Sequence, residues 1–92
     1  MTDEEFLKII SEVIDMLPNS VMFSMGEAVV KHGLQPDNTL AEQYVIAAEE
    51  FGEVAKAILE YDPGLIKECY QTIAMLVKII AIQIKEQKKG RH

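Results

Sequence analysis

Apolar residues recur at intervals of three and four along most of the chain, which is the spacing of one face of an α-helix. Three breaks interrupt the pattern, at residues 17–19, 33–38 and 62–64, and each contains a proline. Proline and glycine commonly interrupt helices, so we place helix boundaries at these breaks. The pattern therefore predicts an all-α fold of four helices, over about 3–17, 20–31, 39–61 and 62–88.

Two short motifs predict where helices begin. Thr2-x-x-Glu5 and Thr39-x-x-Glu42 are capping boxes. In such a box the hydroxyl and the carboxylate each accept a hydrogen bond from a backbone N–H that the first helical turn leaves unpaired. The first and third helices are therefore expected to start at these threonines.

The proline-containing breaks predict the connections. Pro18 is expected to end the first helix, and Gly33 suits the end of the second. Asp62 can cap the fourth helix, with Pro63 at its first position. Because the connection at residues 62–64 is so short, the third and fourth helices are expected to form an antiparallel hairpin.

Apolar seams on the first and third helices predict the core. The spacing of three and four residues places the members of each seam on one side of their helix. The seams are Phe6, Ile10, Val13 and Leu17 in the first helix, and Leu40, Tyr44, Ala48, Phe51, Ala55 and Ile58 in the third.

The fourth helix is apolar on nearly every side, and such a helix must be surrounded by other helices. One chain of 92 residues offers only three partners for it. We therefore expect a helical bundle with a central antiparallel hairpin that is completed by oligomerisation, as a dimer or tetramer. The apolar residues of this helix are Leu65, Ile66, Tyr70, Ile73, Leu76, Val77, Ile79, Ile80, Ile82 and Ile84.

Composition narrows the class of protein. The chain has 49% hydrophobic and 26% charged residues, a balance typical of one globular domain and not of a disordered chain. Its single cysteine excludes an intrachain disulfide framework and a cysteine-rich zinc site. A net charge of −6 argues against a nucleic-acid partner that is held by a broad basic face.

Neither a membrane segment nor an export signal is visible. The N-terminus is acidic where a signal peptide would be basic. The longest apolar stretch, residues 73–84, is interrupted by Lys78 and Gln83 and is shorter than the ~20 residues of a membrane span. A soluble, cytoplasmic protein without a membrane partner is the expectation.

Carboxylates crowd the predicted hairpin. Glu49, Glu50 and Glu53 lie within one turn of the third helix, where like charges cost a few tenths of a kcal/mol per pair. Glu68 and Gln71 are one turn apart on the fourth helix. Glu53 and Gln71 each lie nine residues from Asp62 along the chain, roughly 13 Å from the turn at 1.5 Å per residue.

Three carboxylates and an amide oxygen can therefore converge between the two helices. Such an all-oxygen ligand set favours Mg²⁺ or Mn²⁺ over zinc or copper. A di-iron bundle is disfavoured because it requires Glu-x-x-His pairs. The alternative is that the acidic run is an ordinary solvated helix face.

The pattern Glu49-Glu50-x-x-Glu53 followed by Glu68-x-x-Gln71 resembles the EExxE…ExxD signature of the MazG-like all-α nucleoside triphosphate pyrophosphohydrolases. The resemblance covers about residues 31–85. It implies a helical bundle assembled as a dimer or tetramer. It also implies Mg²⁺-dependent hydrolysis of a nucleoside triphosphate to the monophosphate and pyrophosphate.

The same resemblance implies roles for individual residues. Glu50, Glu53 and Glu68 are expected to be metal ligands, and Glu49 either to be an outer carboxylate or to help to orient the attacking water. Gln71 stands where the pattern has an aspartate. Its neutral carbonyl oxygen can still bind Mg²⁺, but one favourable charge–charge interaction is lost.

Three further residues are candidates for binding substrate. Lys78 follows Gln71 by seven residues on the same helix face and can reach a phosphate, or it can extend from an apolar helix into solvent. Lys31 and His32 can contact phosphate or base, or they can be ordinary cations at a helix C-terminus.

Two functions therefore remain open. The first is a small Mg²⁺-dependent nucleoside triphosphate pyrophosphohydrolase in nucleotide-pool housekeeping. The second is a catalytically inactive helical oligomer that serves as an assembly or partner-binding module.

Overall fold

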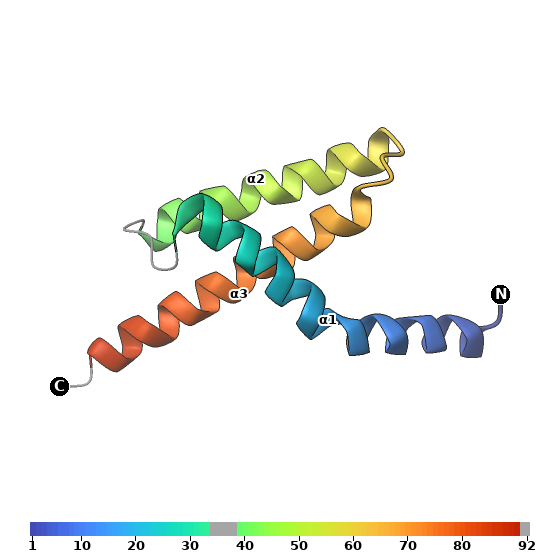
Figure 1. Ribbon diagram of the computed structural model, residues 1–92, viewed down its shortest axis with the longest axis horizontal. Helices are drawn as coiled ribbons and strands as arrows, with labels where there is room; N and C mark the ends of the chain where they lie inside the picture. Colours follow the sequence, from blue (N-terminus) through green and yellow to red (C-terminus); the bar gives the residue numbers. More distant parts are fainter. Residues whose placement is uncertain (34–38, 91–92) are drawn as a thin grey trace.

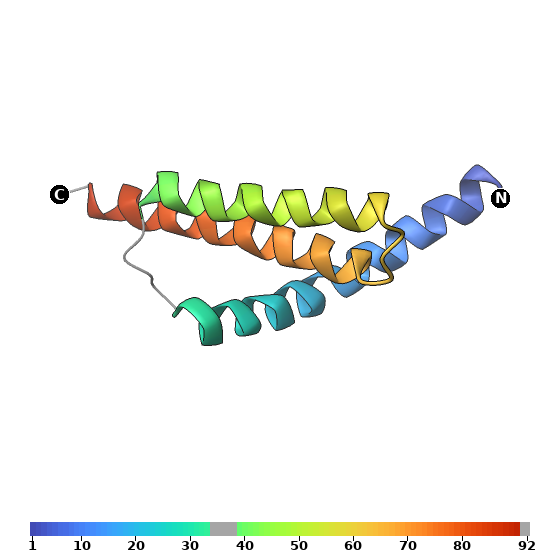
Figure 2. The ribbon, with the colours of Figure 1, turned by 90° about the horizontal axis from the view of Figure 1, so that it is seen from above.

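The computed structural model describes residues 1–33 and 39–90, with only the backbone at His32. These residues form three helices, α1 (Asp3–His32), α2 (Leu40–Leu59) and α3 (Leu65–Lys89), and no strand (Figure 1). The predicted all-α fold is confirmed for this part of the chain. The predicted hairpin is confirmed as well, since α2 and α3 run antiparallel and pack along each other (Figure 2).

Both capping boxes are present. The Thr39 hydroxyl oxygen accepts a hydrogen bond from the Glu42 N–H at 3.1 Å, and the Glu42 carboxylate accepts one from the Thr39 N–H at 3.1 Å. Thr2 and Glu5 make the same pair of bonds at the start of α1. The capping box therefore fixes the residue at which α2 begins. The positions of the glutamates further along the helix follow from that start.

The predicted helix boundary at Pro18 is wrong, because Pro18 lies inside one continuous helix. A proline lacks only its own N–H, so the bond that it removes is the one to the carbonyl of Ile14. The other hydrogen bonds of the helix can form on both sides of the proline. Bending of the helix relieves the clash between the proline ring and the carbonyl of Ile14. Figure 1 shows α1 changing direction near its middle. What we predicted as two helices is therefore one bent helix.

The predicted end of α1 is confirmed. Gly33 follows the helix with a φ of 85°, a conformation that favours glycine, and its N–H donates to the carbonyl of Val29 at 2.8 Å. Most of the predicted break at 33–38 lies outside the described residues.

The start of the last helix differs from the prediction. It begins at Leu65, with Gly64 at the cap position and no side-chain cap. Asp62 instead accepts a hydrogen bond from the Gly64 N–H at 2.7 Å, so its carboxylate shapes the turn that precedes the helix. Pro63 also lies in this turn.

Small and polar side chains form the interface between α2 and α3. Ala47 and Ala57 of α2 and Ala74 and Met75 of α3 are buried. Gln43 is the most deeply buried large side chain, at 1% exposure. Small side chains let two helices approach closely. The second half of α1, from about Val21 onward, crosses α3 and packs against it (Figure 1).

The predicted apolar seams do not form the core of the single chain. In α2 the face toward α3 carries Gln43, Ala47 and Ala57, and the predicted seam points elsewhere. Tyr44, Phe51 and Ile58 of that seam remain 54–69% exposed. Every residue from 1 to 16 is exposed, so within the described residues only Leu17 of the seam expected in α1 is partly covered.

The molecule is more open than a compact monomer of its mass. Its radius of gyration is 15.6 Å, whereas a compact domain of this length has about 12 Å. Its accessible surface is 7,212 Å², whereas about 5,400 Å² is typical for a monomer of 10.4 kDa. Within the described residues, none of the helices combines the length and the apolar character needed to cross a bilayer.

Candidate functional site

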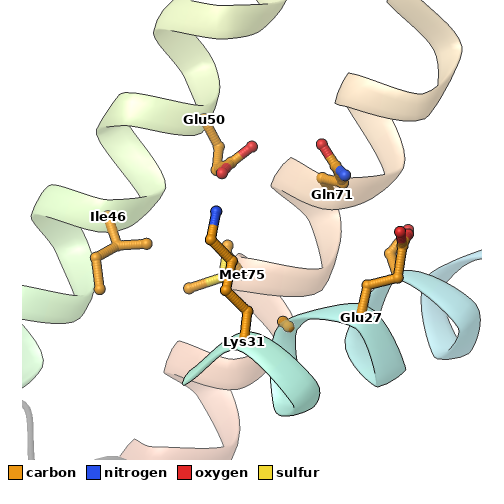
Figure 3. A pocket seen from close by; sticks show the side chains of 8 residues that line it. Glu27, Lys31, Ile46, Glu50, Gln71 and Met75 are labelled. Atoms are coloured by element: carbon orange, nitrogen blue, oxygen red, sulfur yellow. The ribbon is translucent and has the colours of Figure 1, made fainter. Parts of the chain in front are cut away.

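A cavity of about 260 Å³ lies where the three helices meet. Glu50 comes from α2, Gln71 from α3 and Lys31 from α1, and the amine of Lys31 points toward the carboxylate of Glu50 (Figure 3). Glu50 and Gln71 are half-buried, and Lys31 is exposed. The remaining lining residues are Ser24, Glu27, Ala28, Ile46 and Met75.

Glu50 is the electrostatically strained residue of this cavity. Burial raises the pKa of its carboxyl above the ordinary value, and repulsion from Glu68 across the hairpin raises it further. Glu53 and Glu49 add to this repulsion along α2, whereas attraction to Lys31 lowers the pKa in part. An ionised Glu50 therefore costs free energy in this fold, and a nearby cation relieves that cost.

Glu53 and Glu68 line a second, smaller cavity of about 90 Å³. Lys56 lies there too, and it can offset part of their charge. The four predicted ligands are thus divided, with Glu50 and Gln71 on one cavity and Glu53 and Glu68 on the other. In the part of the chain that the structure describes, no group of three or more acidic, histidine or cysteine side chains is close enough to hold a metal ion.

The other candidate residues are placed differently. Glu49 is exposed on α2 next to Glu50. Lys78 is buried, with 6% exposure, and does not line the cavity that holds Glu50. Lys31, which was also a candidate for binding substrate, lines the cavity that holds Glu50. The side chain of His32 lies outside the described residues.

Two residues of α1 that the sequence analysis did not select also line the cavity, Ser24 and Glu27. Glu27 forms an ion pair with Lys67 of α3, with 3.9 Å between the carboxylate oxygen and the amine nitrogen. A signal for them existed, because Ser24, Glu27 and Lys31 are polar residues spaced by three and four on one helix. Their spacing shows that they share a face, but not that this face lies over the hairpin.

The residues present fit a hard divalent cation in their chemistry. Glu50, Glu53, Glu68 and Gln71 offer only oxygen ligands, which Mg²⁺ and Mn²⁺ prefer. The raised pKa of Glu50 indicates excess negative charge at this point of the hairpin. The arrangement therefore combines carboxylates that suit a divalent cation with a lysine on the opposite wall that suits a phosphate group.

Comparison with known proteins adds no family to these observations. The chain matches no protein-family model, no curated protein and no solved structure. Its function is therefore argued from its own residues.

We predict that replacing Glu50 by glutamine stabilises the protein in the absence of divalent cations at neutral pH. Because the pKa of Glu50 is higher in the folded than in the unfolded chain, stability falls as pH rises through the interval between the two values. This cost is fully present above the folded pKa and absent below the unfolded one, near 4.5. The gain for Glu50→Gln at pH 7 should be about 0.5 kcal/mol, similar to one like-charge pair on a helix.

Urea denaturation at a fixed protein concentration, followed from pH 3.5 to pH 8, measures this difference. Glu86→Gln is the matched control, because Glu86 is exposed on α3 away from the acidic cluster, and it should show no comparable gain. A Glu50→Gln variant that is less stable than the parent at pH 7, and equal to it at pH 3.5, would contradict the prediction.

Proposed function

We propose that this protein is a divalent-cation-dependent nucleoside triphosphate pyrophosphohydrolase that releases the nucleoside monophosphate and pyrophosphate. The observation that carries the proposal is the half-buried Glu50, which is crowded by other carboxylates and faces Lys31 across a cavity. The resemblance of Glu49-Glu50-x-x-Glu53 and Glu68-x-x-Gln71 to the MazG-like signature supports the same reaction.

Each residue has a stated part in this proposal. Glu50, Glu53 and Glu68, with the amide oxygen of Gln71, would hold Mg²⁺ or Mn²⁺, which neutralises phosphate charge when bound. Side-chain movement between the two cavities is needed to bring these oxygens together, because the described residues hold no preassembled cluster. Lys31 binds a phosphate oxygen, and Glu49 accepts a hydrogen bond from the attacking water and so orients it.

A neighbouring cavity offers space for the nucleoside. It measures about 490 Å³, shares Ser24 and Glu27 with the cavity of Glu50, and has Phe23 and Tyr70 in its walls. Aromatic side chains can stack on any nucleobase. A phosphate chain at Lys31 and a base between α1 and α3 is therefore a compatible arrangement.

The proposal includes an oligomer. The outer stripe of α2, formed by Tyr44, Ala48, Phe51, Ala55 and Ile58, is exposed along its whole length. At 100° per residue it lies about 120–160° around the helix from Ile46 and Glu50, which line the cavity. A second hairpin can therefore cover the outer stripe without blocking the cavity.

The alternative function is a catalytically inactive helical oligomer. The exposed outer stripe favours an oligomer over a monomer, and this alternative does not require the metal cluster that the described residues lack. The two functions differ in metal binding and turnover, and the experiments below separate them.

We predict that the parent protein binds Mn²⁺ and that Glu53→Ala and Glu68→Ala weaken this binding about tenfold or more, because each removes a charged ligand. Calorimetric titration with Mn²⁺ and with Mg²⁺ measures the affinities. Glu86→Gln, which removes one charge far from the hairpin acids, should bind like the parent. Equally flat titrations for the parent and both alanine variants would contradict the metal site.

Pyrophosphate release from the eight common ribo- and deoxyribonucleoside triphosphates then tests the reaction. The parent should turn over at least one of them with Mg²⁺, and Glu50→Gln should lose this activity while it remains folded. A parent that binds the metal and turns over none of the eight would favour the partner-binding module.

We predict that the protein sediments as a dimer or tetramer of the 10.4-kDa chain at micromolar concentration. Phe51→Glu should shift the distribution toward the monomer, because it places a charge in the centre of the outer stripe. Phe51→Leu keeps that position apolar and should sediment like the parent. A parent that sediments at the mass of one chain would contradict the oligomer.

A further inference from the structure

The N-terminal part of α1 is an unpartnered amphipathic helix. This segment, residues 3–17, is called the acidic arm here. All its residues are exposed except Leu17, which is half-buried. Phe6, Leu7 and Ile14 are 57–65% exposed, although apolar side chains of this size are normally buried. The arm carries five carboxylates and a single lysine. It is therefore both apolar and strongly acidic, and within the described residues only Leu17 of the arm is partly covered.

The C-terminal part of α3 has the complementary character. This segment, residues 80–89, is called the basic end here. A shallow apolar cavity of about 530 Å³ lies on it, lined by Ala81, Ile84, Lys85, Lys88 and Lys89. Ile80 and Ile84 are 59% and 47% exposed. Three lysines and one glutamate give the segment a net positive charge.

The acidic arm and the basic end of one chain cannot meet. The arm projects beyond the hairpin at one extremity of the molecule and the basic end lies at the other, as both views show (Figures 1 and 2). The longest dimension of the molecule is 54 Å. An arm of fifteen residues is only about 22 Å long, so a contact between the two segments must join two molecules.

We propose that the acidic arm of one copy docks on the basic end of α3 in a second copy. A two-fold axis that sets two chains antiparallel brings arm and basic end together at both extremities, so the contact is made twice and the dimer is closed. Apolar side chains of the arm cover the cavity at Ala81 and Ile84, and carboxylates of the arm face Lys88 and Lys89. The complementary charges fix the direction in which the arm lies.

The exposed area agrees with an extensive dimer. The chain exposes about 1,800 Å² more than a compact monomer of its mass. A standard protein interface buries about 800 Å² on each partner, which is less than half of this excess. A contact through the outer stripe alone would therefore leave much of the extra surface exposed. Two reciprocal arm contacts add to the hairpin contact and do not compete with it, because they use different segments.

Charge argues against the other possible occupants. Helices that lie on membranes or bind nucleic acid usually carry Lys and Arg on their polar face, whereas five carboxylates would repel phosphate groups. Two arms that paired with each other would place their carboxylates side by side. A second copy offers the basic, apolar surface that the arm requires.

Cross-linking between two differently tagged copies tests the contact directly. Both copies carry Cys69→Ser, which removes the single cysteine; one also carries Leu7→Cys and the other Ile84→Cys. A short bismaleimide should link the two tags in the mixture, and neither copy should form a homodimer when alone. Leu59→Cys is the matched control, since Leu59 is exposed at the opposite end of the hairpin and should not link to Leu7→Cys. Absence of a link between Leu7→Cys and Ile84→Cys, or links between two Leu7→Cys chains, overturns the proposal.

Charge exchange provides a second readout that does not depend on cysteine chemistry. Asp15→Lys and Lys88→Glu should each weaken the dimer at least threefold in sedimentation at low salt. The two together should restore it. Asp15→Lys with Leu59→Glu adds a carboxylate at an exposed position outside the basic end, and it should stay weak. The proposal is overturned if the effects of Asp15→Lys and Lys88→Glu add in the double variant. It is also overturned if the control double variant restores the dimer.

Neither experiment depends on the catalytic proposal. A dimer linked through its arms that hydrolyses no nucleotide would leave the arm contact standing, and an active enzyme without this contact would leave the pyrophosphohydrolase proposal standing.

Discussion

Burial of one carboxylate beside others in a helical hairpin is the constraint on which the candidate site depends. Glu50 of α2 is half-buried, and Glu68 of α3 repels it across the hairpin. Burial and repulsion together raise the pKa of Glu50. A fold that keeps negative charge in such a place either bears its cost or offsets it with a cation. Our functional proposal follows from the second possibility.

The parts of the fold that depend on local chemistry could be predicted from the sequence. Each capping box needs only residues three positions apart, and both form as expected. The hairpin follows from two apolar helices with a short connection. Pro18 was harder, because a proline can end a helix or bend it, and the choice depends on the chain on both sides. Here α1 continues through the proline, so two expected helices are one.

The core was predicted less well, because periodicity shows which residues share a face but not what that face meets. In α2 the apolar seam through Phe51 was expected to face inward, and the structure instead packs Gln43 and the small residues against α3. The largest apolar side chains are consequently left outside. Our proposal of an oligomer rests on these exposed side chains.

The candidate site likewise has parts that a local pattern predicts and parts that depend on long-range contacts. Equal distance from one turn matched Glu53 with Gln71 in the sequence, whereas the structure places Gln71 beside Glu50 on one cavity and Glu53 on the other. Spacing along the helices did not identify Ser24 or Glu27, because the crossing of α1 over α3 is a long-range contact that no local pattern encodes. Lys31 was selected as a candidate for binding substrate, with an ordinary helix-end cation as the alternative, and only the fold brings it opposite Glu50.

The central claim is that one cation joins the acids of α2 and α3. A crystal structure with Mn²⁺, located by its anomalous scattering, tests it most directly. Our account predicts one strong peak between the helices, with oxygens of Glu50, Glu53 and Glu68 within about 2.3 Å of it. Ordered carboxylates that point away from one another, with no peak between α2 and α3, would contradict it.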